Sequence, residues 1–164
     1  MSGAVEASMR FFGPEEVAIA TERPFQLVDV TDRIAAVVAT SGLAAGSAQV
    51  WCPHTSCGLA VTEMEDGLHA DVEALAERLA PIDGDYVHDD LARRHQNLEP
   101  DERRNGWSHL RALLLTAPTV VVPVVAGGLA LGQWQRLFLV ELDGPRRRRV
   151  SVQAWGRAGT PDGA

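Results

Sequence analysis

The C-terminal third of the chain places the strongest constraint on the fold, because short apolar runs alternate there with turns. Glycine and proline mark the turns at Ala126-Gly127-Gly128 and Asp143-Gly144-Pro145. Runs of strand-forming residues joined by tight turns predict antiparallel strands. The predicted strands are 120–125, 129–134, 137–142 and 149–155.

The first two thirds of the chain mix helical and strand patterns. Residues 66–79 give the clearest helical pattern, with apolar residues at helical spacing, acids in the first turn and Pro81 after the end. A second helix follows a cap at Asp29 or Thr31 and ends at Gly42, and a third spans 108–115. Strands are predicted at 15–21, 46–51 and 59–64.

These elements predict an α+β fold with a mainly antiparallel, β-sandwich-like core and two or three helices. We expect one domain over residues 1–164, with an ordered core of about 14–156. Residues 1–13 are predicted to be a loosely ordered leader, and the small polar residues after Gly156 a frayed tail. The polar segment 81–106 lacks periodicity, which is typical of a functional or mobile loop.

Composition excludes some classes of function. A net charge of −7 argues against a general binder of nucleic acid or anionic membranes, since both need a basic face. A small anionic substrate remains compatible with it, because one pocket can be positive on an acidic protein. The N-terminus does not have the pattern of a signal peptide, and two cysteines make no disulfide framework. We therefore expect a cytoplasmic protein with reduced thiols.

The five histidines form no compact metal signature, because neither an H-x-x-x-H pair nor a C-x-x-C pair is present. His69 within a helix and His95 beside two arginines are interpreted as structural or surface residues. His54, His88 and His109 lie where elements begin or end, and functional side chains concentrate at such positions. A lone histidine at such a position is more often a hydrogen-bonded structural residue than a ligand.

Three other features allow both a functional and a structural interpretation. Glu63 ends a strand and is either a general base or a solvated strand end. Cys57 lies near His54 but is better explained as a small buried thiol. The run Arg146 to Arg149 could bind a phosphate or simply be solvated, and strand alternation directs half of it to each face.

Several motifs together resemble the YjbQ family, an uncharacterised protein family sometimes labelled a secondary thiamine-phosphate synthase. In order and spacing they cover roughly residues 15–155. The matching segments are Pro53-His54-Thr55-Ser56-Cys57-Gly58-Leu59 with Thr62-Glu63, Glu65-Asp66-Gly67, Tyr86-Val87-His88-Asp89-Asp90, Asn105-Gly106-Trp107-Ser108-His109-Leu110-Arg111-Ala112, Pro123-Val124-Val125, and Gly127 with Leu131-Gly132-Gln133-Trp134-Gln135.

The resemblance implies a homotrimer with a site built around three histidines, His54, His88 and His109. It also implies catalytic roles for Glu63, His54 and Asn105, and substrate binding by Trp134, Gln135 and Ser108. Departures from the family pattern are Thr62 for Asn, Trp107 for His and Gln133 for Thr. The replacement at Trp107 matters most, because a histidine there could have been a ligand or an acid.

Three neutral imidazoles with an open position suit zinc or a similar divalent ion. Glu63 could then complete the ligand set or take a proton from bound water. Without a metal, the same groups could bind phosphate near the helix start at Ser108. The sequence thus predicts an enzyme acting on a small phosphorylated or heterocyclic substrate, with thiamine-phosphate synthase activity at most a side reaction. The alternatives are a non-catalytic trimer that binds a metal or small ligand, and a purely structural module.

Overall fold

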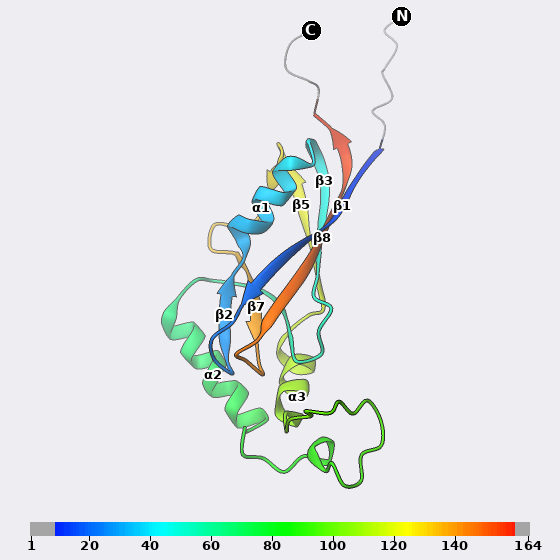
Figure 1. Cartoon of the computed structure of the whole chain (residues 1–164). Coiled ribbons are helices and arrows are strands. Elements are labelled where there is room, and N and C mark those ends of the chain that lie inside the picture. The colour runs from blue at the N-terminus through cyan, green and yellow to red at the C-terminus, as the bar shows by residue number, and fades with distance from the viewer. Residues whose placement is uncertain (1–8, 160–164) are drawn as a thin grey trace, which may run out of the picture.

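The computed structural model describes residues 9–159, which form an α+β fold with two antiparallel sheets and three α-helices (Figure 1). The predicted fold class is therefore confirmed. The larger sheet has the strand order β1 (Met9–Ala20), β8 (Arg147–Ala158), β3 (Leu43–Trp51), β5 (Thr119–Val125), β6 (Gly128–Leu129). The smaller sheet has the order β2 (Gln26–Asp29), β7 (Arg136–Glu141), β4 (Cys57–Thr62).

The main core lies between the two sheets. Alternation sends Val50 and Val152 of the larger sheet inward, and Leu139 of the smaller sheet meets them. Helix α1 (Thr31–Thr40) adds Ile34 and Val38 to the same cluster. These side chains are almost fully buried, so the hydrophobic effect holds both sheets and α1 together.

A second core covers the other face of the smaller sheet. Phe138 and Val140 point away from the main core and pack with Ala76 of α2 (Asp66–Leu79). Helix α3 (Gly106–Leu115) lies beside α2, where its buried Arg111 donates to the carbonyl of Ala80. Both helices and the loop between them lie at the end of the molecule away from the termini (Figure 1).

Three sequence predictions need correction. Arg157 and Ala158, predicted to belong to a frayed tail, continue β8. The predicted leader over residues 1–8 and the tail over 160–164 lie outside the described residues. Residues 9–13 belong to β1 and not to a leader, because β1 pairs with β8 along its whole length, with a bulge at Gly13. The predicted strand 129–134 shrinks to the two residues of β6. Pro123 faces β6 with its carbonyl, which accepts from Ala130, but it has no N–H to extend the ladder.

The short strand β2 was not predicted. The other elements fall close to their predictions, and together they bring four distant segments side by side. These segments are the loop 53–56 between the sheets, the short 3-10 helix η1 (Val87–Asp89), the start of α3, and the turn 143–146 before β8. Within the described residues, no helix has the length and apolar character needed to cross a membrane.

Candidate functional site

Two of the predicted histidines lie against each other. His88 in η1 and His109 in the first turn of α3 have ring centroids 4.6 Å apart with an edge-on arrangement. The Nδ1 atom of His109 lies 3.0 Å from the carbonyl oxygen of Thr55. A carbonyl can only accept, so Nδ1 carries the proton and the lone pair of a neutral His109 is on Nε2. His109 is therefore oriented to act as a base through Nε2.

Arg94 fixes the other histidine. Its guanidinium lies 3.2 Å from Nε2 of His88 and only 2.6 Å from a carboxylate oxygen of Glu102. Because a guanidinium can only donate, Nε2 of His88 accepts and the ring is neutral. Burial lowers the pKa of His88, and the neighbouring His109 and Arg94 lower it further. His88 is thus held in its neutral form near pH 7.

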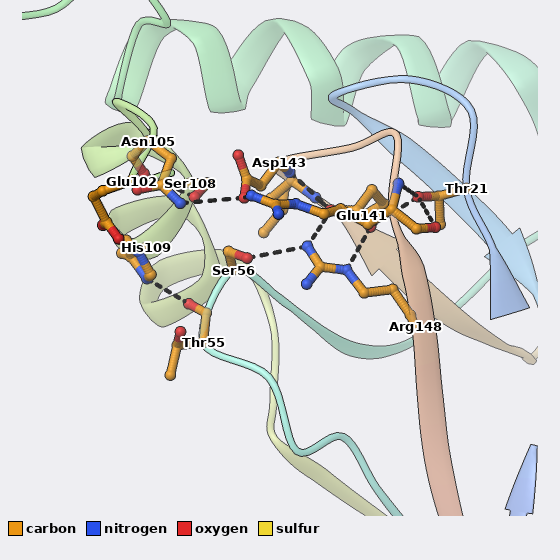
Figure 2. Close-up of polar contacts among 12 residues, drawn as sticks. Thr21, Thr55, Ser56, Glu102, Asn105, Ser108, His109, Glu141, Asp143 and Arg148 are labelled. Carbon is orange, nitrogen blue, oxygen red and sulfur yellow. Dashed lines mark hydrogen bonds and ion pairs between the residues drawn. The ribbon is translucent and has the colours of Figure 1, made fainter. Parts of the chain in front are cut away.

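Arg148 forms a buried ion pair beneath the histidines. Its guanidinium donates to both carboxylate oxygens of Glu141 at 2.7 Å and to the Ser56 hydroxyl at 3.0 Å (Figure 2). Burial alone would raise the pKa of Glu141, but the bonds from Arg148 hold it below its ordinary value. The carboxylate is therefore charged, and its bonds to Arg148 fix that guanidinium in place.

A second carboxylate, that of Asp143, fixes two further side chains of the site. Asp143 accepts from Arg146 and from the amide of Asn105, the latter at 3.1 Å (Figure 2). Asn105 is almost fully buried at the start of α3, where its backbone N–H also donates to Asp89. Since its amide nitrogen must face the Asp143 carboxylate, the orientation of the Asn105 side chain is settled by its partner.

These groups line one cavity of about 420 Å³, which we name the histidine–arginine pocket. Its walls are polar and include two histidines, three arginines and Asn105. Each arginine is bonded to one carboxylate, so the arginine charges are locally compensated. The pocket is therefore rich in directed N–H donors without a large net positive charge. It is lined by Thr55, Ser56, His88, Arg94, Asn97, Glu102, Asn105, His109, Asp143, Arg146 and Arg148.

Comparison with known proteins agrees with this architecture. The family model described as UPF0047 protein YjbQ-like matches residues 15–157. The chain belongs to the UPF0047 (YjbQ-like) family. A UPF0047 protein of Archaeoglobus fulgidus is 38% identical over 139 residues, which cover 85% of this chain and 98% of the relative. One from Methanothermobacter thermautotrophicus is 34% identical over 143 residues, 87% of this chain and 92% of the relative.

Solved structures of UPF0047-like proteins share the fold. A YbjQ-like protein of unknown function from Sulfolobus solfataricus superposes with a TM-score of 0.77 at 32% identity, covering 92% of this chain and all of that one. A hypothetical protein from Aeropyrum pernix gives a TM-score of 0.74 at 33% identity, covering 86% of this chain and 96% of that one. The family and its fold are thus established, and the activity is a separate question.

The third histidine expected of this UPF0047 chain lies to one side of the pair. Nε2 of His54 accepts the backbone N–H of Arg149 at 3.2 Å. Burial lowers the pKa of His54, and the charge of Arg148 adds to that effect. His54 and His109 line a second, more apolar hollow of about 350 Å³ together with Cys57. His109 thus separates two hollows, with His88 on one side and His54 on the other.

Three further predicted residues lie at the opposite end of the smaller sheet. Glu63 follows β4, and Trp134 and Gln135 precede β7, where Thr62 pairs with Arg136. Glu63 is six residues from Cys57, or about 20 Å along an extended strand. The exposed fraction of Trp134 is 66%, so its indole faces open solvent in the single chain. The structure does not bring these residues to His54, His88 or His109 of the same chain; the histidine next to Glu63 is His69, whose Nε2 lies 3.1 Å from the Glu63 carbonyl oxygen.

Ser108 is close to the pocket but does not line it. Its hydroxyl is fully buried and donates to the carbonyl of Asn105 at 2.8 Å. It stabilises the first turn of α3 in this position.

A three-histidine metal centre does not match the single UPF0047 chain. In residues 9–159, no three histidine, cysteine, aspartate or glutamate side chains lie together as metal ligands. Nε2 of His54 and Nε2 of His88 are already bonded, to Arg149 and Arg94. A cation at His88 would also have to displace the positively charged guanidinium. The zinc site stays a prediction, and it would need ligands beyond these three side chains of one chain.

Of the three arginines that line the pocket, only Arg94 has no signal in the sequence. Arg94 was passed over as part of a solvated loop, and nothing local marks its contact with His88. Arg146 and Arg148 carried a usable signal, because alternation placed them on the face opposite to Arg147 and Arg149. The structure confirms that division: Arg148 is buried and Arg146 lines the pocket, whereas Arg147 and Arg149 are exposed.

Proposed function

We propose that the histidine–arginine pocket binds a small phosphorylated substrate and that His88 and His109 transfer protons during its conversion. The observation that carries the proposal is a pair of adjacent imidazoles, His88 held neutral, in a cavity of about 420 Å³ walled by arginine donors. Guanidinium groups match phosphate oxygens in geometry and charge. A neutral imidazole is the commonest general base near pH 7.

Two buried polar atoms support a ligand with two kinds of hydrogen-bonding group. Within the described residues, Nε of Arg146 and Oδ1 of Asn105 are buried without a partner, and both residues line the pocket. An unpaired buried donor or acceptor costs roughly 1–3 kcal/mol. A ligand that offers an anionic oxygen to Arg146 and an N–H or O–H to Asn105 would satisfy both. A phosphorylated heterocycle or phosphorylated alcohol has this chemistry.

The roles of the two histidines differ. His109 is bonded through Nδ1 to the Thr55 carbonyl, which leaves Nε2 to accept a proton from the substrate. The pKa of His88 is lowered by burial and by its neighbours, so protonating both rings at once is unfavourable. The pair therefore suits a single proton that is taken up and later returned.

Transfer chemistry of the thiamine-phosphate synthase type has weaker support. Such a reaction releases pyrophosphate and normally uses acidic magnesium ligands. The pocket carboxylates Glu102 and Asp143 are each bonded to an arginine. We therefore favour proton transfer on a phosphorylated compound and treat the synthase reaction as a side activity at most. A cytoplasmic location, which suits a soluble phosphorylated substrate, is part of the same proposal.

A specific observation favours assembly into the homotrimer that the family resemblance implies. The face of the larger sheet that points away from the core carries exposed Trp51, Val121 and Val125, with exposed fractions of 45–60%. Trp134 adds a further exposed indole. Exposed apolar side chains grouped on one face are typical of an interface. A non-catalytic, ligand-binding trimer is accordingly the second candidate function.

Isothermal titration with inorganic phosphate tests the binding step. Arg146→Met should weaken phosphate binding by roughly 10–100-fold, because a hydrogen bond to a charged group contributes about 1.5–3 kcal/mol. Arg147→Met is the matched control, since the same charge is removed at the next residue of the chain from a side chain that faces solvent. Equal weakening by both variants would mean that phosphate is attracted by general charge and not by the pocket.

A screen for turnover separates the enzyme from the non-catalytic binder. Small phosphorylated heterocycles and alcohols would be incubated with the wild-type protein and with His109→Gln. If the protein is an enzyme, the wild type should convert at least one of these compounds. His109→Gln should lose that conversion while it still binds phosphate. Phosphate binding that depends on Arg146, with no compound converted, would support the non-catalytic candidate.

A further inference from the structure

We propose that Cys52 and Cys57 form a reversible intramolecular disulfide, so that this pair of thiols is a site of oxidative modification. These are the only two cysteines in the chain, and both are free and buried in the structure. Their Sγ atoms lie 3.5 Å apart. A disulfide has an S–S distance of about 2.05 Å, so the two sulfurs must approach by only about 1.5 Å.

The two cysteines belong to different sheets. Cys52 directly follows β3 of the larger sheet, where its N–H donates to the carbonyl of Pro118 at 2.8 Å. Cys57 begins β4 of the smaller sheet and pairs with Glu141. The chain crosses between the sheets in the four intervening residues. A disulfide would therefore fasten the sheets together at the point where the chain passes from one to the other.

A small oxidant can reach the pair from the hollow shared by His54 and His109, because Cys57 lines it. We take hydrogen peroxide as the oxidant. One thiol reacts with the peroxide O–O bond to give a sulfenic acid and releases one water. The second thiol then attacks that sulfur, the S–S bond forms, and the sulfenic oxygen leaves as a second water. The hydrogen bond between the two thiols lowers the pKa of Cys52 and raises the pKa of Cys57. The thiolate that reacts with the peroxide is therefore that of Cys52, which lies directly behind Cys57.

The segment enclosed by the cysteines supports the histidine–arginine pocket. The carbonyl of Thr55 orients His109, and the hydroxyl of Ser56 accepts from Arg148. Drawing Cys52 and Cys57 together displaces the chain that carries both contacts. On the basis of the proposed function, the disulfide should also weaken phosphate binding by roughly threefold or more, since preorganised sites tolerate only about 0.5 Å of error.

Mass spectrometry of the intact wild-type protein tests the disulfide without any variant. Treatment of the reduced protein with hydrogen peroxide should lower its mass by about 2 Da and remove both thiols, and dithiothreitol should restore them. A gain of oxygen atoms with no loss of hydrogen would overturn the proposal. Disulfide-linked pairs of chains, seen on a non-reducing gel, would also overturn it.

Cys57→Ser supplies the control, because it should trap Cys52 as a sulfenic acid that a dimedone probe labels. Phosphate titration of the oxidised and reduced wild-type protein then reads out the effect on the pocket. Disulfide formation is scored by mass alone, so it stands or fails separately from phosphate binding. If the peroxide-treated protein does not lose about 2 Da, this inference is refuted. If neither the reduced nor the oxidised protein binds phosphate, the proposed function is refuted.

Discussion

The two ends of the smaller sheet differ in how their polar groups are satisfied. At one end, Glu141 and Arg148 form a buried pair, and further bonds lead through Ser56 toward the histidines. At the other end, Arg136 bonds to Asp29 and Asp32, but its side chain is about one third exposed. Dissolved salt therefore weakens the attraction between these charges. Both ends therefore carry an arginine bonded to acids, in very different environments.

Exposed apolar side chains occur at both ends, so they do not separate the two. Val87 and Leu113 are exposed at the histidine end, and Trp134 and Met64 at the Glu63 end. The histidine end differs because α3 and the loop that follows α2 bring polar groups around one cavity there (Figure 1). An end with a cavity and preformed hydrogen bonds is suited to bind a small molecule, because little ordering remains to be done on binding. An open end with large apolar side chains is suited to meet another protein surface.

The same substitution at both ends should give the largest contrast in stability. Arg148→Met leaves Glu141 buried without its main partner, which should lower the free energy of unfolding by about 3–5 kcal/mol. Arg136→Met should cost about 1 kcal/mol or less, as for exposed pairs. Urea denaturation followed by circular dichroism measures both. Similar losses for the two variants would contradict the idea that burial distinguishes the two ends.

A double variant sharpens this result. Glu141→Leu together with Arg148→Met replaces a buried ion pair by apolar side chains, and such replacements are often neutral or stabilising. It should therefore recover most of the stability that Arg148→Met loses. Failure to recover would show that the polar groups around Glu141 need the carboxylate itself, since Thr21 and two backbone N–H groups also donate to it.

The pH dependence of stability should come mainly from the histidine end. The pKa values of His88 and His54 are lowered in the folded protein, first by burial. Unfolded histidines bind protons below about pH 6.5, so the unfolded state takes up more protons there and stability falls as pH decreases. Above that pH both states are neutral and the effect vanishes. Melting temperatures of the wild type and His88→Gln between pH 8 and 5 should show a shallower fall for the variant.

Substitution of Arg94 gives an independent check on what lowers the pKa of His88. Its charge is one of the groups that lower the pKa of His88, after burial and His109. Arg94→Met should therefore raise the pKa of His88 toward its ordinary value, as measured by NMR titration of the imidazole protons. An unchanged pKa would assign the whole effect to burial and to His109.

Local signals in the sequence predicted the elements well and the contacts poorly. The helix of residues 66–79 was predicted with the observed ends, because acids, periodicity and Pro81 agree there. Its apolar residues are not all buried: Leu79 is 51% exposed because only a narrow stripe around Ala76 meets the sheet. The predicted strand ends at Leu129 because Pro123, on the neighbouring strand β5, has no N–H to donate to it. The proline thus shortens the strand that it faces and not its own strand.

The candidate site shows the same limit at longer range. The family resemblance selected His88 and His109, and the fold places them in contact although twenty residues, most of them loop, separate them in the sequence. Arg94 and Glu102 belong to that loop, and no periodic pattern predicts which of its polar side chains turn inward. Glu63 illustrates the opposite case, since a motif close to His54 in sequence extends along a strand to the far end of the sheet. Sequence proximity along a strand becomes separation in space.

The smallest expected effect concerns Glu63, and it decides whether the two ends are independent. Glu63→Gln removes one charge about 20 Å from the pocket of its own chain, a distance at which salt screens exposed charges almost completely. Phosphate affinity should therefore change by less than about twofold, well below the effect of Arg146→Met. Titration at physiological salt measures it, with Asp66→Asn as a control for a neighbouring exposed acid. A tenfold loss specific to Glu63→Gln would mean that a second copy of the chain places its open end over this pocket. The pocket would then be completed by assembly, and Trp134→Ser should weaken both trimer formation and phosphate binding.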